Sequence, residues 1–185
     1  MVLLGMAMSI SMCFLKKIYI FGKFFFKFEF MYIIDRIANE KRIAHILPLL
    51  KDDFEKLTVR RHSFNWKKLE KVSYMYKLTL AGEDDILGVI SLVDHFAEER
   101  IEIKLLAVSI ENRGRNKQFD RIAGCLIAFA GREAIKKFKN YPSVSLIPKT
   151  ELKRHYINKY GMIDAGWQLF IDETIVLNLI SKYLA

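Results

Sequence analysis

The stretch from residue 100 to residue 139 constrains the fold more than any other part of the chain. Residues 101–110 are largely apolar, rich in β-branched side chains and free of Gly and Pro, which predicts a buried strand. Residues 111–120 are polar and cationic and include a glycine, which predicts a turn. Apolar residues then recur at helical spacing between charged ones, which predicts an amphipathic helix. These apolar positions are Phe119, Ile122, Ala123, Leu126, Ala130 and Ala134.

A strand that leads through a cationic turn into a helix offers a site for an anion. The first N–H groups of a helix have no partner within it, and the helix macrodipole adds about half a positive charge at that end. An ordinary strand–helix connection has the same pattern. From physical chemistry alone, both interpretations stay open.

The residues of this stretch resemble the acetyl-CoA-binding core of the GNAT N-acetyltransferase superfamily. In that family, a strand ending in Ala-Val precedes a loop of pattern Q/R-x-x-G-x-G/A, and the loop opens a helix. Here residues 107–108 end the strand as Ala-Val, and residues 118–123 match the loop except that Arg121 replaces the central glycine. A second register puts the family's Arg-Gly pair on residues 113–114 and leaves an insertion before the helix.

The resemblance implies a binding mode for acetyl-CoA. The strand end would hold the pantetheine arm, and amides of the loop and first helical turn would hold the pyrophosphate with help from nearby cations. The implied cofactor-binding residues are Leu106, Ala107, Val108, Arg113, Gly114, Gln118, Arg121, Ile122, Ala123 and Gly124. At Arg121 two arrangements are open, because the side chain either obstructs the phosphates or points its guanidinium at them. We expect the second arrangement, since the surrounding turn is cationic.

The resemblance also suggests a general base. Glu102 lies six residues before Val108, in the neighbourhood that carries the general-base glutamate in histone-acetylating members of the superfamily. A carboxylate there would take a proton from the acceptor ammonium, directly or through water, and would work best with a raised pKa. The alternative is structural: Glu102 would then pair only with Lys104 or with a neighbouring strand.

A candidate general acid lies on a predicted helix over residues 151–159. Residues 156–162 resemble the family's F-Y-x-x-x-G-F segment, whose Tyr protonates the departing coenzyme A thiolate. Alignment on Gly161 puts Ile157 at the position of that Tyr, so Tyr156 serves as the acid only if the helix is shifted by one residue. Otherwise Tyr156 is a packed aromatic residue of the helix.

The resemblance and the periodicity of the remaining segments predict an α/β (α+β) GNAT fold. We expect a central mixed, mostly antiparallel sheet flanked by helices, with a splayed parallel strand pair at the cofactor slot. The patterns predict further strands over 32–37, 73–80, 86–93, 144–147 and 165–172, and further helices over 40–57 and 173–184. Asp94 and His95 fall in a predicted turn with no third partner, so we do not expect a catalytic pair there.

The length of 185 residues suits one domain with its own core. We predict a single GNAT-like domain over residues 31–185, preceded by an apolar and aromatic extension over residues 1–30. The extension shows no clear signal-peptide pattern, and Lys16 and Lys17 interrupt it too early for a transmembrane helix. Either Met31 is the true start, or the extension lies on a membrane surface, where lysines beside aromatic residues are favourable.

The chain is basic, with 30 Lys and Arg against 21 Asp and Glu. This charge suits an anionic cofactor or acceptor. The basic residues at 60–62 and 67–68 lack a longer array of stacking aromatics, which favours a solvated helix face over a nucleic-acid surface. Cys13 and Cys125 lack metal-ligand spacing, so we predict no metal site and a reduced, cytoplasmic protein. A homodimer is compatible with the sequence.

These observations lead to two functional hypotheses. The first is an N-acyltransferase that transfers acetyl from acetyl-CoA to a primary amine by direct attack. The alternative is a catalytically degenerate GNAT-like protein that binds coenzyme A or a partner, because Arg121 replaces a glycine and Ile157 replaces the family acid. The sequence does not identify the acceptor amine. Membrane contact is expected only if residues 1–30 belong to the protein.

Overall fold

A nine-stranded sheet organises residues 31–138 and 140–184, the part of the chain that the computed structural model describes. The strands are β1 (Met31–Asp35), β2 (Glu40–Pro48), β3 (Tyr74–Leu80), β4 (Gly88–His95), β5 (Arg100–Val108), β6 (Phe119–Asp120), β7 (Ser143–Leu146), β8 (Ile163–Ala165) and β9 (Gln168–Ile171). Their order in the sheet is β6-β1-β2-β3-β4-β5-β7-β9-β8, and only β5 and β7 pair in parallel. The predicted mixed, mostly antiparallel sheet is confirmed.

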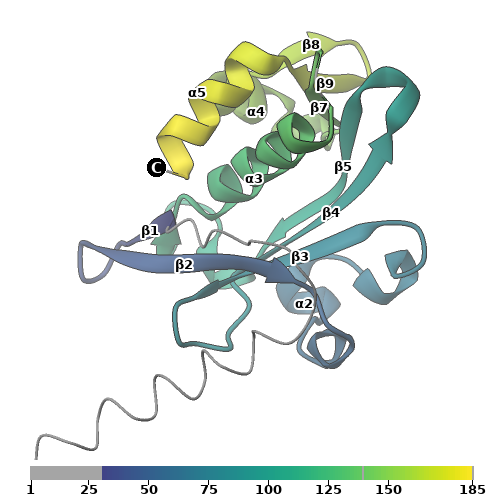
Figure 1. The fold of residues 1–185 in the computed structure, drawn as a ribbon. Coiled ribbons are helices and arrows are strands. Elements are labelled where there is room, and N and C mark those ends of the chain that lie inside the picture. Colours follow the sequence, from purple (N-terminus) through teal and green to yellow (C-terminus); the bar gives the residue numbers. More distant parts are fainter. Residues whose placement is uncertain (1–30, 139, 185) are drawn as a thin grey trace, which may run out of the picture.

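Helices cover both faces of this sheet. The α-helices are α2 (Val59–His62), α3 (Ile122–Lys137), α4 (Lys153–Tyr160) and α5 (Glu173–Tyr183), and the 3-10 helices are η1 (Lys51–Glu55), η2 (Trp66–Leu69), η3 (Phe96–Glu98), η4 (Ile110–Asn112) and η5 (Thr150–Leu152). Figure 1 shows α3 and α5 side by side over one face, with α2 on the other side of the sheet. The predicted boundary at Met31 stays a prediction, because residues 1–30 lie outside the described residues.

The predicted helix over residues 40–57 is wrong. Residues 40–48 instead form β2, which pairs with β1 on one side and with β3 on the other. Ile43 and Leu50, which the helical interpretation placed on a packed face, are exposed. Ladder hydrogen bonds to two strands outweigh the helical spacing of the apolar residues, and those partners are not visible in the local pattern. The chain turns helical only at η1, after Pro48 has ended the strand.

Two smaller expectations also change. Residues 163–171 form the β8–β9 hairpin rather than one strand, and Gly166, with φ +84°, opens its two-residue loop. Trp167 therefore lies at the hairpin tip with 71% of its surface exposed. Asp94 and His95 do not lie in a turn, because β4 continues through both of them and pairs with β5.

The central helix α3 is buried along most of its length between β5 and α5. A Cβ atom added to Gly124 would lie 2.2 Å from the Tyr183 ring, so only glycine permits this close approach of α3 and α5. Because α3 is fixed on both sides, the position of its N-terminus relative to β5 is fixed as well.

The parallel pair separates partway along β5. Residues 100–103 pair with β7, and the remaining residues of β5 pair only with β4. At the point of separation, Leu92 faces Ile103 while Ser91 faces Leu105, so Lys104 is an extra residue in β5. Such a bulge bends its strand locally. The predicted splayed pair is confirmed, and the gap opens beside Leu106.

Candidate active site

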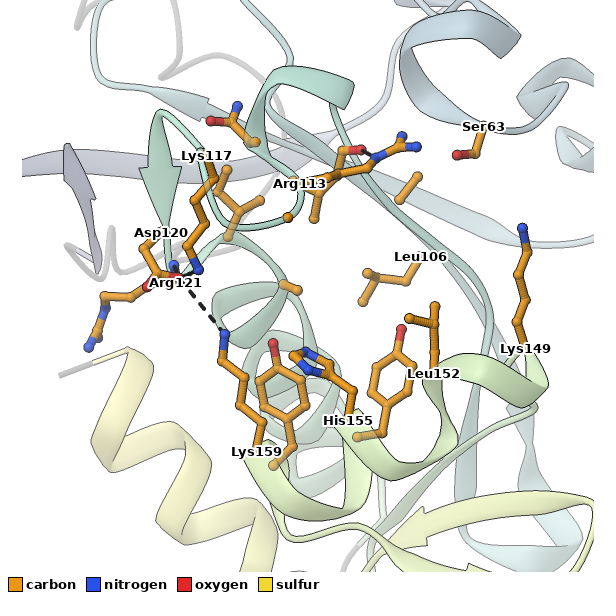
Figure 2. A pocket seen from close by; sticks show the side chains of 18 of the residues that line it. Ser63, Leu106, Arg113, Lys117, Asp120, Arg121, Lys149, Leu152, His155 and Lys159 are labelled. Atoms are coloured by element: carbon orange, nitrogen blue, oxygen red, sulfur yellow. Dashed lines mark hydrogen bonds and ion pairs between the residues drawn. The ribbon is translucent and has the colours of Figure 1, made fainter. Parts of the chain in front are cut away.

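A pocket of about 600 Å³ extends from residues 106–108 of β5, beyond the part of β5 that pairs with β7, to the N-terminus of α3 (Figure 2). Most of the sequence-predicted site residues line it: Leu106, Ala107, Val108, Arg113, Gly114, Arg121, Ile122, Ala123 and Tyr156. Three do not, namely Glu102, Gln118 and Gly124. Gln118 uses its backbone in pairs with Arg36 and Glu111, and Gly124 faces Tyr183.

The loop that follows β5 is closed by one buried side chain, Asn112. Its Nδ2 donates to Ser109 Oγ at 2.9 Å, and its Oδ1 accepts from the Phe119 N–H at 2.7 Å. Within the closed loop, Gly114 takes a φ of +72°, which favours glycine. The sequence analysis did not single out Asn112. The signal was present, since an Asn shortly before a Gly after a strand is common where side chains bond the backbone of a turn.

The N-terminus of α3 opens into the pocket without a side-chain cap. Arg121 is the N-cap residue, in the left-handed conformation with φ +77°, and its side chain makes no capping hydrogen bond. Ile122 and Ala123, the first helical residues, line the pocket. Their N–H groups have no acceptor within the helix and are therefore available to an anion.

The Arg121 side chain takes neither of the two arrangements expected from the sequence. Figure 2 shows it directed away from the pocket, so it neither obstructs the opening nor faces an anion there. Its Nε donates to the Tyr32 carbonyl at 3.2 Å, and its Nη2 donates to the Lys182 carbonyl at 2.6 Å. The backbone conformation explains this direction, because a left-handed residue points its side chain differently from a residue inside the helix.

Three charged groups gather beside the α3 N-terminus, and we call this part of the pocket the α3 end. Lys117 Nζ lies 2.6 Å from Asp120 Oδ1, and Lys159 Nζ lies 3.8 Å from the same oxygen. Two ammonium groups therefore share one carboxylate. Burial lowers the pKa of Lys159, and the nearby charges of Lys117 and Lys182 lower it further. An anion bound here would offset that repulsion.

Helix α4 presents one continuous face to the pocket. Leu152, His155, Tyr156, Lys159 and Tyr160 line it, at the spacing of a single helical face. Tyr156 and Ile157 both pack against the main core. Of these two residues, Tyr156 also lines the pocket, and its role as the acid stays a prediction.

The Tyr156 phenol is partly buried among aromatic rings. Its ring centroid lies 5.9 Å from that of Tyr160 and 6.0 Å from that of His155. Burial raises the pKa of Tyr156, so the hydroxyl keeps its proton at neutral pH. Within residues 31–138 and 140–184, no group forms a hydrogen bond with this hydroxyl.

Glu102 lies outside the pocket lining, on the face of β5 opposite to Ile101 and Ile103. Its Oε2 accepts from His95 Nε2 at 2.9 Å, and its Oε1 accepts from Lys104 Nζ at 3.2 Å. Burial acts to raise the pKa of Glu102, but these two hydrogen bonds outweigh it and the pKa is lowered. The pairing with Lys104 is the structural alternative expected from the sequence, and His95 is a partner that the sequence did not reveal.

Comparison with known proteins gives a fold but no close relative. Neither a protein-family profile nor a curated protein sequence matches this chain. AtaT in the AtaT–AtaR complex bound to DNA superposes with a TM-score of 0.53 at 14% identity, over 74% of this chain and 99% of AtaT. The putative streptothricin acetyltransferase of Bacillus anthracis, in complex with acetyl coenzyme A, superposes with a TM-score of 0.50 at 14% identity, over 70% and 94% of the two chains. The fold is that of the GNAT acetyltransferases.

Within this GNAT fold, a second group of residues lines the pocket far from the α3 end. Figure 2 shows Ser63 and Lys149 on that side. Phe64 lines the pocket as well, and Lys149 Nζ lies 5.7 Å from its ring centroid. We call this part the α2 end. The sequence analysis assigned none of these residues to the site, because the two segments are far apart in the chain.

The α2 end is fixed by ion pairs and burial rather than by a solvated helix face. Arg61 pairs bidentately with Asp85 and also pairs with Glu111, which ties α2 to the loop after β5. His62 is fully buried, and its Nε2 lies 3.0 Å from the Ile86 carbonyl. The predicted solvated face therefore holds for Arg60, Lys67 and Lys68, which are exposed. It does not hold for Arg61, which is partly buried, or for His62.

The described part of the chain contains neither a cluster of metal ligands nor a helix that could span a membrane. Among its residues, no group of three His, Cys, Asp or Glu side chains is placed to hold a metal ion. Its helices are all too short or too polar to span a bilayer.

Proposed function

We propose that this protein is an acyl-CoA-dependent N-acyltransferase that transfers acetyl from acetyl-CoA to a primary amine by direct attack. The observation that carries the proposal is one continuous pocket. It starts at residues 106–108 of β5, beyond the part of β5 that pairs with β7, and ends at the uncapped N-terminus of α3. The GNAT fold and neighbours that contain acetyl coenzyme A support it.

The residues present suit acetyl-CoA. The β7-facing edge of β5 beyond Ile103 has no strand partner, so backbone groups along residues 106–108 are available to the amides of a pantetheine arm. The Val108 carbonyl is the exception, because it accepts from Arg113 Nε at 2.6 Å. At the α3 end, free amides of the first helical turn suit a pyrophosphate. Lys117 and Lys159, which share one carboxylate, add cationic groups for the same phosphates.

The proposed reaction needs two proton transfers and correct positioning. Bound acetyl-CoA supplies the thioester carbonyl. Tyr156 is the proposed acid for the departing thiolate, because its hydroxyl keeps its proton and lines the pocket. Glu102 is the proposed acceptor of the ammonium proton through water, because it lies outside the pocket lining. Since its pKa is lowered, it is ionised at neutral pH but is a weak base.

Binding and turnover can be tested separately. Calorimetry on the full chain should give saturable binding of acetyl-CoA and CoA. Free-thiol release should then depend on an added amine, tested with a polyamine, a lysine peptide, a peptide with a free N-terminus and an aminoacyl-tRNA. The last acceptor is included because the neighbour AtaT is known in complex with acetyl-methionyl-tRNAfMet, with a TM-score of 0.50 at 13% identity. No binding of either coenzyme would refute the proposal.

A catalytically degenerate, coenzyme A-binding protein is the second candidate. The observation that favours it is Ile157, which stands at the family's acid position and packs in the core. Binding of acetyl-CoA without thiol release in the presence of any amine would support this candidate. The cytoplasmic location, a homodimer and a membrane role of residues 1–30 remain predictions from the sequence.

A further inference from the structure

The Arg121 side chain joins the two ends of the described chain. Its two hydrogen bonds reach a carbonyl in β1, that of Tyr32, and a carbonyl in the last turn of α5, that of Lys182. Its guanidinium carbon also lies 4.1 Å from the ring centroid of Tyr32 and 4.9 Å from that of Tyr183. The guanidinium is therefore held between two aromatic rings while it donates to two carbonyls.

This arrangement stabilises α5 at its C-terminus. The last four carbonyls of a helix lack partners within it and carry a partial negative charge. The guanidinium that donates to the Lys182 carbonyl supplies both a hydrogen-bond donor and a positive charge at this end of the helix. The conformational free-energy cost of this arrangement lies in the backbone of Arg121, whose φ of +77° is a conformation that favours glycine. Such a conformation persists where surrounding contacts fix it.

Other contacts join the same turn to the same two chain ends. β6, directly before Arg121, pairs antiparallel with β1 through Asp120 and Phe119. One turn into α3, Gly124 lies against Tyr183 with no room for a Cβ atom. Arg121 is thus the side chain that completes a connection which the backbone already forms on both sides.

We propose that Arg121 is a positioning residue, which holds the N-terminus of α3 by binding β1 and the C-terminus of α5 and does not touch the bound phosphate. This inference rests on the proposed function, since the phosphate is that of coenzyme A. Arg121 stands where the family loop has a glycine, and the side chain that this substitution adds binds α5. Coenzyme affinity then depends on a helix outside the pocket.

Coupling of this kind is reciprocal. If α5 holds the phosphate-binding turn, then CoA binding should slow amide hydrogen exchange in residues 180–184. Conversely, loss of the Arg121 contacts should weaken CoA binding, although no positively charged group that contacts the phosphates is removed.

The affinity test compares three variants of the full chain, with CoA as the ligand. Arg121→Gly removes the contacts, and glycine accepts the positive φ without strain. Arg121→Lys keeps the charge but lacks the planar fork that reaches two carbonyls. Arg115→Gln is the control, because Arg115 is an exposed cation of the same loop outside the pocket lining. Calorimetry at two salt concentrations measures affinity and its salt dependence.

We expect both Arg121 variants to bind CoA at least about fivefold more weakly than the parent, with unchanged salt dependence, and Arg115→Gln to bind normally. A phosphate-gripping arginine predicts the opposite pattern. Arg121→Gly would then lose affinity together with salt dependence, while Arg121→Lys would bind nearly as well as the parent. That pattern, or undiminished affinity in Arg121→Gly, would overturn the proposal.

Hydrogen exchange without ligand separates this inference from the proposed function. Arg121→Gly and Arg121→Lys should both speed exchange in residues 118–124 and 180–184 and leave β3 and β4 unchanged. Unchanged exchange at both segments would refute the positioning role, even if CoA binds. If the parent chain binds no CoA, the proposed function fails. Faster amide exchange in the Arg121 variants at residues 118–124 and 180–184 would still establish the connection between α3 and α5. Should Arg121→Gly not fold, Arg121→Lys decides by the same measurement.

Discussion

The α3 end of the pocket and the side chains proposed for proton transfer differ in what fixes them. The α3 end is held by contacts from several elements, namely a loop closed by the Asn112 side chain, a strand pair between β6 and β1, and a buried helix. Proton transfer depends on Tyr156 and Glu102, two single side chains on different elements. The comparison indicates that coenzyme binding depends on many contacts, whereas turnover depends on two side chains. Mutations should therefore affect the two properties separately.

Tyr156→Phe is expected to have the largest effect on turnover. Removal of the hydroxyl takes away the proposed acid and should lower kcat by about 100-fold, the lower range for general acid catalysis. Affinity for CoA should stay unchanged, because the ring remains. Steady-state thiol release and calorimetry measure the two quantities. Tyr160→Phe, one turn along the same face, is the matched control, and an equal loss of kcat there would remove the special role of Tyr156.

Asn112→Ala tests the other side of the comparison. It leaves the Phe119 N–H and the Ser109 hydroxyl without their partner in a buried site, at a cost of about 1–3 kcal/mol of folding free energy for each unsatisfied group. CoA affinity should fall as well, because the loop is no longer closed. Denaturant unfolding measures the stability, with the exposed Asn158→Ala as control. Equal stability of the two variants would show that the backbone alone shapes the loop.

Lys159→Gln should weaken CoA binding by about tenfold, which corresponds to loss of one charge-assisted hydrogen bond of roughly 1.5 kcal/mol. Its salt dependence should decrease too, because Lys159 faces the phosphates in our proposal. Arg154→Gln, an exposed cation on the same helix outside the lining, should change neither quantity. A kcat effect larger than the affinity effect would place Lys159 with the reactive groups instead.

Glu102→Gln should lower the rate by a smaller factor, severalfold, because His95 and Lys104 already hold the carboxylate. The effect of this substitution on the pH dependence of the rate follows from the pKa of Glu102. Since the pKa of Glu102 lies below its ordinary value, the group is ionised throughout the neutral range. The rate profile above pH 6 should therefore keep its shape in the variant. A flattened rise near neutral pH would mean that substrate raises this pKa well above its value in the free protein.

His62 should give the smallest effect, a pH dependence of stability at the α2 end. Burial lowers its pKa, so the folded protein favours the neutral ring and the unfolded chain takes up the proton first. Stability should thus fall as pH drops below about 6.5, the ordinary His value, and level off below the folded pKa. Thermal unfolding between pH 5 and 8 measures this. His62→Gln, which still offers a donor to the Ile86 carbonyl, should reduce the slope.

The sequence alone determined the strand–turn–helix unit around β5 and α3 and the parallel pair of β5 with β7. The unit is local, because apolar runs, helical spacing and turn residues record which faces are buried within one segment. The parallel pair follows instead from the helical crossover between the two strands, which favours parallel neighbours. The same local reasoning failed for β2. Its apolar residues have helical spacing, and only its pairing with β1 and β3 makes it a strand.

Tertiary structure decided which side chains face the pocket. The orientation of α4 places Tyr156 rather than Ile157 in the pocket lining, and the register of β4 and β5 places His95 near Glu102. The direction of Arg121 depends on Tyr32 and Lys182, which lie near opposite ends of the described chain. A sequence pattern records the burial of a residue, but the partner of a polar group is fixed only when distant segments meet, and those partners determine charge, pKa and orientation.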